Sequence, residues 1–492
     1  MKKQTKVLLA AAALTLGASF TSMAAPLNNG TWVLNEEGWQ YADKNGEYVD
    51  EKWCVSYGTQ YWINEDYVLG SSEWVVEEAS SGKTYYNYAQ SDGSKAINTW
   101  KYLYAPGDDD EEFEQDWYYF DSKGRMVANE AKFQIGDYYY YFDADGKMLT
   151  GWIDKNELKK AEEAAAPTVG TVVYCNEDGQ LIRNSWLNMF PWTMTEDEAY
   201  EDDYKYFYAD GNGKLYSTKK AIDNHTYFFN AETGAMMTGW IIKDGTVYTG
   251  ANAKLAAGNE VYWTDDEIGY AKKNQWLKLA TPQSDDSDSF WYWFDKNGKL
   301  FAPTATDSNV TEMNFADGES YDVEPVAGKT YEAKSKKFGD TYYFFRGNGE
   351  MIDGLVSIDN ELNYLVDGAR QTGSVSLEDD DLDNYTFYFA AKTDATAKTT
   401  KYAAVTGYFD GHVYKNGQMM TAVDNYAIVE VEINGKNYEF LVDVNGNVQY
   451  GTKEYTLDET HATYGDSFKA KDDNKAFNKS AKDVTKYAII NK

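Results

Sequence analysis

Proline, cysteine and histidine are scarce in this chain of 492 residues, which contains 7, 2 and 3 of them respectively. Cys54 and Cys175 lie far apart in the sequence, so they form either one long-range disulfide or two buried thiols, and no metal-type cluster. His225, His412 and His461 are scattered, without His-Glu-x-x-His or another ligand spacing. We therefore expect no metal site, no redox chemistry and no cofactor.

Basic residues are also few, because 46 Lys and Arg stand against 80 Asp and Glu, which gives a formal net charge of −34. A field of this sign repels nucleic acid and anionic lipid, so we expect neither as a partner. Cation-bearing ligands and neutral glycans remain compatible with it. The acidity is explained equally well if it simply keeps an aromatic-rich surface soluble.

Long apolar runs occur only at the N-terminus, where three lysines in the first six residues precede Val7–Gly17 (VLLAAAALTLG). This pattern predicts a secretory signal peptide over residues 1–24, with the mature chain beginning at Ala25. No later stretch approaches the ~20 apolar residues of a membrane span, so we expect no membrane insertion. The sequence has neither a lipid-attachment cysteine near the cleavage site nor a wall-sorting tail. We therefore expect a secreted protein that is held at the cell surface without covalent bonds.

Aromatic residues are abundant, with 43 tyrosines and 15 tryptophans, and they recur in one motif. Trp117-Tyr118-Tyr119-Phe120-Asp121 is followed two residues later by Gly-Arg-Met. Strong copies of this motif are Tyr139–Trp152, Thr226–Trp240, Trp291–Leu300 and Tyr342–Gly354. Weaker copies extend from Trp39 to about residue 450. Such internal repetition is typical of a solenoid or array.

Each copy predicts a β-hairpin, in which a short aromatic strand is followed by an Asp-x-x-Gly or Asn-Gly turn and a second strand that opens with Lys, Met or Leu. The turn glycine supplies a positive φ, and the aspartate ahead of it can hydrogen-bond the turn backbone. Because an isolated hairpin is marginal in water, stability must come from stacking hairpin on hairpin. The sequence therefore predicts an all-β solenoid of tandem aromatic β-hairpin repeats, in two sub-arrays.

The pattern WYYFD-x-x-G-x-M-x-T-G-W resembles the cell-wall-binding, or choline-binding, repeat family of secreted Gram-positive surface proteins, and Tyr139–Trp152 matches it at nearly every position. The resemblance covers most of the mature chain. It implies a superhelix of hairpins with ligand pockets between successive hairpins. The Gly-Trp pair survives only at Gly151-Trp152 and Gly239-Trp240, so we expect many units to be purely structural.

The resemblance also implies the composition of the pockets, since the family combines the Trp of the Gly-Trp pair with nearby aromatics and a Met. For any single ring, stacking within the solenoid is the simpler interpretation. The candidate ligand-binding residues are Trp152 with Tyr139, Tyr141 and Met148, then Trp240 with Met236, and as weaker candidates Trp117, Tyr119, Trp291 and Trp293.

The predicted organisation divides at segments that interrupt the repeat. A short helix or hinge is expected at 154–170, where Asp154–Ala166 (DKNELKKAEEAAA) precedes Pro167. Acidic insertions, read as long surface loops, are Asp108–Asp116, Glu196–Asp203, Asp285–Asp288 and Glu378–Asp383. The expected parts are a signal peptide (1–24), a first hairpin array (25–153), the hinge (154–170), a second array (171–300), an irregular insertion (301–340), C-terminal hairpins (341–450) and a polar tail (451–492).

No catalytic residues are predicted. The repeat-poor stretches are each about forty residues, below the size of a domain that is stable alone, and no nucleophile, P-loop or dinucleotide motif is present. The sequence gives no positive indication of the paired carboxylates that glycoside hydrolysis requires. Asp143–Gly146 and Asp443–Asn447 are partly similar to calcium loops, but they lack the closing glutamate, so turn chemistry is favoured.

The sequence thus favours a non-catalytic protein that binds cell-wall polysaccharide, teichoic acid or another glycan through aromatic pockets. Choline is the alternative ligand, because a quaternary ammonium is attracted to aromatic faces. A third hypothesis is a structural or adhesive surface spacer whose acidic loops meet a host or neighbouring protein.

Overall fold

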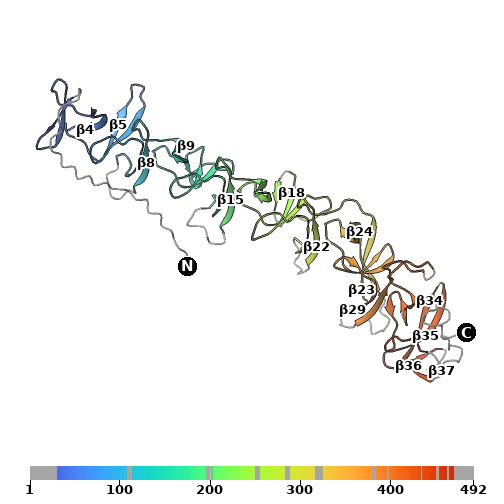
Figure 1. Cartoon of the computed structure of the whole chain (residues 1–492). Coiled ribbons are helices and arrows are strands. Elements are labelled where there is room, and N and C mark those ends of the chain that lie inside the picture. Colours follow the sequence, from blue (N-terminus) through green and yellow to red (C-terminus); the bar gives the residue numbers. More distant parts are fainter. Residues whose placement is uncertain are drawn as a thin grey trace. The chain divides into compact units, whose positions relative to one another are not determined.

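The computed structural model describes residues 30–469, except for 108–113, 195–199, 201–202, 246, 250–254, 283–288, 316–324, 379–383, 396–397, 410, 434, 450–453 and 463–464. The predicted signal peptide lies outside these residues. The described chain is built mainly from short antiparallel strands, and its one helix there is the 3-10 turn η1 (Ala161–Glu163). No helix of the described part is long and apolar enough to cross a membrane. The predicted all-β fold of small hairpin sheets is confirmed (Figure 1).

The chain divides into two compact units. Unit 1 comprises residues 1–217 and 232–235, and unit 2 comprises the rest. In the described residues, the sheets of unit 1 are the pairs β1-β2, β3-β4, β5-β6, β7-β8, β9-β10 and β14-β15 and the three-stranded sheet β12-β11-β13. The strands of unit 1 are β1 (Gly30–Leu34), β2 (Trp39–Asp43), β3 (Lys52–Ser56), β4 (Thr59–Ile63), β5 (Glu73–Glu78), β6 (Thr84–Ala89), β7 (Thr99–Leu103), β8 (Asp116–Phe120), β9 (Glu130–Ile135), β10 (Tyr138–Phe142), β11 (Gly151–Asp154), β12 (Lys159–Lys160), β13 (Val172–Cys175), β14 (Ser185–Met189) and β15 (Lys205–Ala209).

Unit 2 begins with small sheets and continues into larger ones. Their orders are β16-β17, β19-β18-β20, β21-β22, β25-β24-β23-β26-β27-β28, β29-β30-β33-β32-β31 and β35-β34-β36-β37. The strands are β16 (Thr218–Ile222), β17 (His225–Phe229), β18 (Gly239–Asp244), β19 (Val247–Thr249), β20 (Val261–Thr264), β21 (Gln275–Ala280), β22 (Ser289–Phe294), β23 (Ser308–Phe315), β24 (Pro325–Phe338), β25 (Thr341–Arg346), β26 (Gly354–Ile358), β27 (Glu361–Val366), β28 (Ala369–Arg370), β29 (Gly373–Glu378), β30 (Asn384–Phe389), β31 (Gly407–Phe409), β32 (His412–Lys415), β33 (Gln418–Met419), β34 (Tyr426–Ile433), β35 (Lys436–Asp443), β36 (Glu454–His461) and β37 (Gly465–Lys469).

The hairpins pair their strands differently from the expectation. The aromatic strand β8 pairs with the preceding strand β7, whereas the residues after its turn form only a single bridge, Phe120 to Met126. The reason is that the N–H of Met126 donates to the carbonyl of Tyr86 in the preceding hairpin (2.7 Å), while the N–H of Val127 donates to Tyr119 (2.9 Å). The segment after the turn therefore links two hairpins and is not the second strand of one.

Tryptophans at the second position of a hairpin's first strand pack onto the next hairpin. The ring of Trp100 in β7 lies 5.0 Å from Tyr140 and 5.7 Å from Phe142 of β10. Trp240 in β18 lies 4.9 Å from Tyr292 of β22 in the same manner. Aromatic stacking of this kind holds successive hairpins together in each unit, which confirms the predicted stacking of tandem repeats.

The turns use aspartate as predicted. The Oδ1 atom of Asp121 accepts the N–H groups of Lys123 (2.7 Å) and Arg125 (2.9 Å), and the glycine between them has φ of 71°. Asp143 and Asp443 bond their own turns in the same way, and the described residues contain no cluster of three or more metal-ligating side chains. The carboxylates of the two partly calcium-like loops are therefore engaged by the turn backbone.

Three expected boundaries differ from the structure. Residues 154–170 do not separate the two compact units, because β11 and β13 pair on either side of them and the units divide at 217. The insertion 301–340 is not irregular, since it supplies β23 and β24 to a six-stranded sheet. The tail contains the paired strands β36 and β37. In β36 exposed Glu454 and Thr456 alternate with buried Tyr455 and Leu457, and repeat matching does not detect that pattern.

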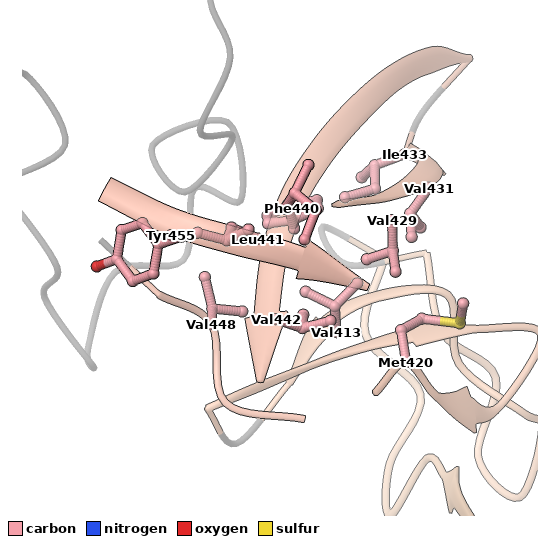
Figure 2. Packing of buried hydrophobic residues seen from close by; sticks show 11 residues of the cluster. Val413, Met420, Val429, Val431, Ile433, Phe440, Leu441, Val442, Val448 and Tyr455 are labelled. Atoms are coloured by element: carbon pink, nitrogen blue, oxygen red, sulfur yellow. The ribbon is translucent and has the colours of Figure 1, made fainter. Parts of the chain in front are cut away.

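The end of unit 2 has an aliphatic core. Figure 2 shows Val429, Val431 and Ile433 of β34 beside Phe440 of β35, with Met420 nearby. The facing strands are each eight residues long, and Val429 lies directly opposite Phe440. The apolar cluster therefore consists mainly of residues of this sheet, with Val413 of β32 and Met420 packed against them.

The acidic insertions lie largely outside the described residues. Only their flanks are placed, such as Asp116 at the start of β8 and Asp203 before β15. The hypothesis of a spacer that meets a protein partner through these loops stays a prediction.

Candidate functional site

A cavity of about 630 Å³ lies beside Trp152 within unit 1. It is bounded by β11, η1 and β13, by the end of β14 and by the loop that leads to β15. Its aromatic lining consists of Trp152, Tyr174, Phe190, Trp192 and Tyr204. Met189, Met194, Thr150, Gly151, Lys160, Glu162 and Glu177 complete the wall.

Trp152 is fixed at the base of this cavity. It is 7% exposed, and its ring lies 5.0 Å from Tyr174 and 5.2 Å from Phe207 in edge-to-face contacts. Its indole N–H donates to the carbonyl of Phe190 (2.9 Å). A ring locked by both packing and a hydrogen bond forms a rigid wall that requires no ordering when a ligand binds.

Trp192 forms a second fixed wall. It is 8% exposed, and its indole N–H donates to the carbonyl of Thr233 (2.9 Å), which also belongs to unit 1. Phe190 and Tyr204 meet edge to face at 6.3 Å, and Tyr204 is 46% exposed. The cavity thus combines a buried aromatic floor with an accessible aromatic rim.

Charged groups at the cavity are mainly acidic. Glu162 lies in η1, Glu177 lies in the turn after β13, and Lys160 precedes η1; all three are exposed. Aromatic faces and carboxylates together attract an organic cation, while exposed polar side chains beside a ring also suit a sugar. The arrangement can therefore bind a ligand non-covalently.

The residues grouped with Trp152 from the sequence do not share its cavity. Tyr141 is 2% exposed and belongs to the neighbouring cluster with Ile153, where burial raises the pKa of its hydroxyl to about 12. Tyr139 packs against that cluster, and its ring carries the guanidinium of Arg183 at 4.5 Å and the ammonium of Lys132 at 5.2 Å. Trp152 and Ile153 are neighbours in β11, so their side chains point to opposite sides of the strand. Tyr139 and Tyr141 pack on the side of Ile153 and are thereby separated from Trp152.

The predicted methionines serve as packing elements between turns. Met148 fills the space where a Cβ on Gly179 would lie, and Met236 does the same at Gly269. Both glycines have positive φ, 76° and 72°. These methionines therefore seat the next turn and do not line the cavity beside Trp152.

The other candidate tryptophans and tyrosines are dispersed. Trp240 is 6% exposed, and its indole N–H donates to Ala280 (3.0 Å). Tyr119 is buried beneath Trp100, at 5.1 Å, whereas Trp117 is 38% exposed. The indole N–H of Trp291 donates to Asp367 (3.0 Å), and Trp293 packs on Phe338 (4.7 Å).

Two further cavities are less suited to an aromatic-binding ligand. One of about 690 Å³ in unit 1 includes Tyr85, but the guanidinium of Arg125 already lies 3.8 Å from that ring. One of about 480 Å³ in unit 2 is lined largely by polar residues such as Thr399, Thr406 and Asn416. The 690 Å³ cavity also joins aromatic rings to carboxylates, but the cavity beside Trp152 has the larger aromatic lining, with five aromatic side chains.

Sequence reasoning missed most of its lining. Phe190, Trp192 and Tyr204 stand in the long connection between β14 and β15, outside the repeat motif. The sequence did contain a signal for this part of the site in Phe190-Pro191-Trp192. Its two aromatic residues lie in a connecting loop and not in a strand of the repeat, and they follow Ser185-Trp186, a partial Gly-Trp pair.

The buried cysteines do not pair. Cys54 and Cys175 are both free in unit 1. Burial raises the pKa of the Cys54 thiol to about 11 and raises that of Cys175 as well. Of the two alternatives left by the sequence, the structure has two buried thiols.

Comparison with known proteins places the repeat. Residues 112–151 match the family model of the choline-binding repeat. No curated protein matches the sequence. Among solved structures, similar ones from Streptococcus pneumoniae are choline binding protein F (18% identity, TM-score 0.34, covering 74% of this chain and 98% of that one) and CbpJ (16%, 0.27, 85% and 100%).

A third similar structure is the modular autolysin LytC of Streptococcus pneumoniae (17% identity, TM-score 0.28, covering 71% of this chain). The chain spans about half of LytC, 52% of its length. The aromatic motif and the family match agree for one segment: residues 112–151 carry a repeat of the choline-binding repeat family.

Proposed function

We propose that the chain is a non-catalytic binding protein that attaches without covalent bonds to a cell-wall polymer at the cell surface. The cavity beside Trp152 receives a quaternary ammonium group of that polymer, such as choline. The observation that carries this proposal is one cavity that joins five aromatic side chains to two carboxylates.

The charges at the cavity favour a cation over a neutral sugar. A quaternary ammonium cannot donate a classical hydrogen bond, so it gains from ring faces and from nearby negative charge. Glu162 and Glu177 supply that charge, and Lys160 offsets only part of it. Because a single site offers few contacts, we expect a dissociation constant on the order of millimolar. Several linked contacts to one polymer would raise the overall affinity.

A neutral glycan is the second candidate, and the observation that favours it is the exposed ring of Tyr204. A ring that is 46% exposed offers a face on which a sugar can stack, beside polar side chains such as Thr150 and Lys160. In that case the carboxylates would act as hydrogen-bond acceptors and not as counter-charges.

The absence of catalysis is also part of the proposal. The longest segments that do not match the repeat are occupied by strands, β23 and β24 in one case and β36 and β37 in the other. Purified chain incubated with cell walls is expected to release neither reducing ends nor muropeptides. Release of either product would refute a purely binding role.

Isothermal titration calorimetry with choline chloride and with an N-acetylglucosamine oligomer tests the ligand. Choline should bind, and Glu162→Gln with Glu177→Gln should weaken it by about tenfold, because removal of two charges costs roughly 1.4 kcal/mol. The same pair should leave binding of a sugar nearly unchanged. Sugar binding without choline binding would replace the first candidate by the second.

Matched controls keep folding and binding apart. Tyr204→Ala should weaken binding of either ligand, whereas Tyr206→Ala, a tyrosine of equal 46% exposure that does not line the cavity, should not. Trp152 is unsuitable for this test, because it is a core residue. Equal losses for the two tyrosine variants would remove the cavity from the proposal.

A further inference from the structure

A glutamate, an asparagine and a lysine meet on one face of the hairpin β5-β6 in unit 1. Glu77 of β5 lies opposite Tyr85 of β6, and Asn87 is two residues further along β6. Lys95 follows the turn of the hairpin and bridges back to Ala89. Residues opposite each other, and residues two apart in a strand, share a face of a sheet. The side chains of Glu77, Asn87 and Lys95 therefore extend on the same side.

One carboxylate oxygen contacts both nitrogen atoms of this group. The amide nitrogen Nδ2 of Asn87 donates to Oε2 of Glu77 (2.7 Å). The side-chain nitrogen Nζ of Lys95 lies 3.5 Å from the same oxygen. A base that reaches an amine and an amide nitrogen together can carry a proton from one to the other.

The lysine is held in a buried position. Lys95 is 8% exposed, and its methylene stem fills the space where a Cβ on Gly124 would lie. Its Nζ lies 4.6 Å from the ring centroid of Trp53. Burial is the largest influence on the pKa of Lys95 and lowers it, although the charge of Glu77 opposes this change. Burial thus favours the uncharged amine, which is the nucleophilic form of lysine.

The asparagine is buried and only partly satisfied. Asn87 is 0% exposed, and its Oδ1 has no hydrogen-bond partner among the described residues. A buried structural asparagine normally has partners for both ends of its amide, so an unpartnered oxygen requires another explanation. An amide that is held by its nitrogen alone, beside a buried amine, is placed as a reactant.

We propose that Lys95 and Asn87 become joined by an isopeptide bond, formed once in each molecule with Glu77 as the proton carrier. The lone pair of Nζ attacks Cγ of Asn87, and Nζ gives a proton to Oε2 of Glu77. Glu77 returns this proton to Nδ2, the Cγ–Nδ2 bond breaks, and ammonia leaves. One amide replaces another, so the step needs neither an oxidant nor a reductant.

The bond would fasten a junction between two hairpins. The backbone N–H of Lys95 donates to the carbonyl of Gln60 in β4 (2.8 Å), so Lys95 stands in a segment that links β5-β6 to the preceding hairpin. A covalent bond from Lys95 to β6 would hold this segment in place when the hydrogen bonds open. The reaction modifies the chain itself and does not involve the cavity beside Trp152, so it is independent of the proposed binding function.

Mass spectrometry of the purified full chain tests the proposal. The chain should be lighter than its sequence requires by one ammonia, about 17 Da. Trypsin should not cleave after Lys95, because its amine is acylated, so residues 84–101 should appear as one peptide in place of 84–95. Chymotrypsin, which cleaves after Tyr88, should leave two peptides that are still joined. A succinimide at Asn87 also loses ammonia, but it leaves Lys95 open to trypsin.

Three variants assign the roles. Lys95→Arg keeps the positive charge without the amine and should restore the full mass. Glu77→Gln keeps both reacting groups and should slow formation of the bond by at least about a hundredfold, measured as the unlinked fraction of freshly purified chain over time. Glu78→Gln changes the neighbouring exposed acid on the opposite face of β5 and should leave the bond fully formed.

The outcomes separate chemistry from folding. A wild-type chain that has its full mass and is cleaved after Lys95 would overturn the proposal. A loss of ammonia that persists in Lys95→Arg would do the same. If Glu77→Gln does not fold, the masses of the wild-type chain and of Glu78→Gln still decide whether the bond forms. A folded Glu77→Gln chain that is linked as fast as the wild type would refute the role of Glu77.

Discussion

The hairpins of unit 1 and the last sheet of unit 2 bury their apolar side chains in different ways. In unit 1 a typical cluster joins Tyr88, Tyr118 and Phe120 with Trp74, so that two successive hairpins, β5-β6 and β7-β8, contribute large rings. In the sheet β35-β34-β36-β37 the cluster is mostly Val, Ile and Leu, and facing residues come from adjacent strands (Figure 2).

The difference shows where stability resides. A five-residue strand has room for two or three inward side chains, so a short hairpin must use large rings that reach its neighbour. Two facing strands of eight residues can bury aliphatic side chains, and Val413, Met420, Tyr455 and Leu457 pack with them in one cluster. We therefore expect damage to spread between neighbouring hairpins in unit 1 and to remain local in the last sheet.

The largest expected effect is that of Trp152→Ala. Loss of a buried Trp that contacts Tyr174 and Phe207 should cost about 3–5 kcal/mol of unfolding free energy. It also leaves the carbonyl of Phe190 without its indole donor. Urea unfolding followed by circular dichroism measures it, with the 38% exposed Trp117→Ala as the control. Similar costs for the two variants would contradict the structural role of Trp152.

A smaller effect is expected for Leu441→Ala in the last sheet. Leu441 is fully buried, so its truncation should cost about 2–5 kcal/mol. Because its contacts lie within the sheet, hydrogen exchange should increase in residues 426–469 and stay unchanged in unit 1. Val444→Ala, at a turn position that is 43% exposed, is the control. Faster exchange throughout the chain would show that the sheet is not locally stabilised.

Acid should weaken unit 2 through two carboxylates. Partial burial opposes their ionisation, but hydrogen bonds outweigh it and lower the pKa of Glu260 from 4.5 to about 2 and that of Asp307 from 3.8 to about 2. Between the pKa of the unfolded chain and that of the folded chain, the unfolded chain binds more protons than the folded one. The stability that these two carboxylates confer is therefore complete above pH 4.5 and is lost as the pH falls to about 2.

The size of this acid effect is modest, at most about 1 kcal/mol for each group, because both are partly solvated. Glu260→Gln and Asp307→Asn should each reduce the difference in unfolding free energy between about pH 5 and pH 2.5. Comparison with the parent cancels the general repulsion among the many acids of this chain. A pH dependence that is unchanged in both variants would argue against these hydrogen bonds.

The smallest and most local test uses the two thiols. Cys54 and Cys175 are buried in unit 1 and have raised pKa values. A disulfide reagent should therefore label both thiols slowly in the native chain and rapidly after unfolding. Labelling then reports the opening of unit 1 alone. Trp152→Ala should accelerate it, whereas Leu441→Ala should not. Rapid labelling of the native chain would be inconsistent with the burial of either thiol.

The sequence predicted the class of fold better than the pairing of its strands. Tyr118-Tyr119-Phe120 and the following Asp-x-x-Gly turn indicated a strand and a turn correctly, because both signals are local. The true partner of that strand, β7, lies on the other side of a long acidic connection, and nothing in the residues of β8 indicates it. Long-range pairing therefore required the structure.

The candidate site follows the same division. Trp152 was predicted from its Gly-Trp pair and does line the cavity, but Tyr139 and Tyr141, grouped with it from the family's pocket pattern, belong to another cluster. Phe190, Trp192 and Tyr204 reach the cavity from later parts of unit 1. A site assembled between hairpins takes its side chains from residues that no local motif connects.

The indole hydrogen bonds also impose an order on folding during synthesis. The N–H of Trp152 is satisfied by Phe190, and that of Trp240 by Ala280, which are 38 and 40 residues further along the chain. The hairpins of these two tryptophans therefore emerge with an aromatic surface and a polar donor that their own residues do not cover. Such a hairpin is not fully packed until the next one has been synthesised. A ribosome that pauses at a hairpin boundary therefore leaves the preceding hairpin exposed to aggregation.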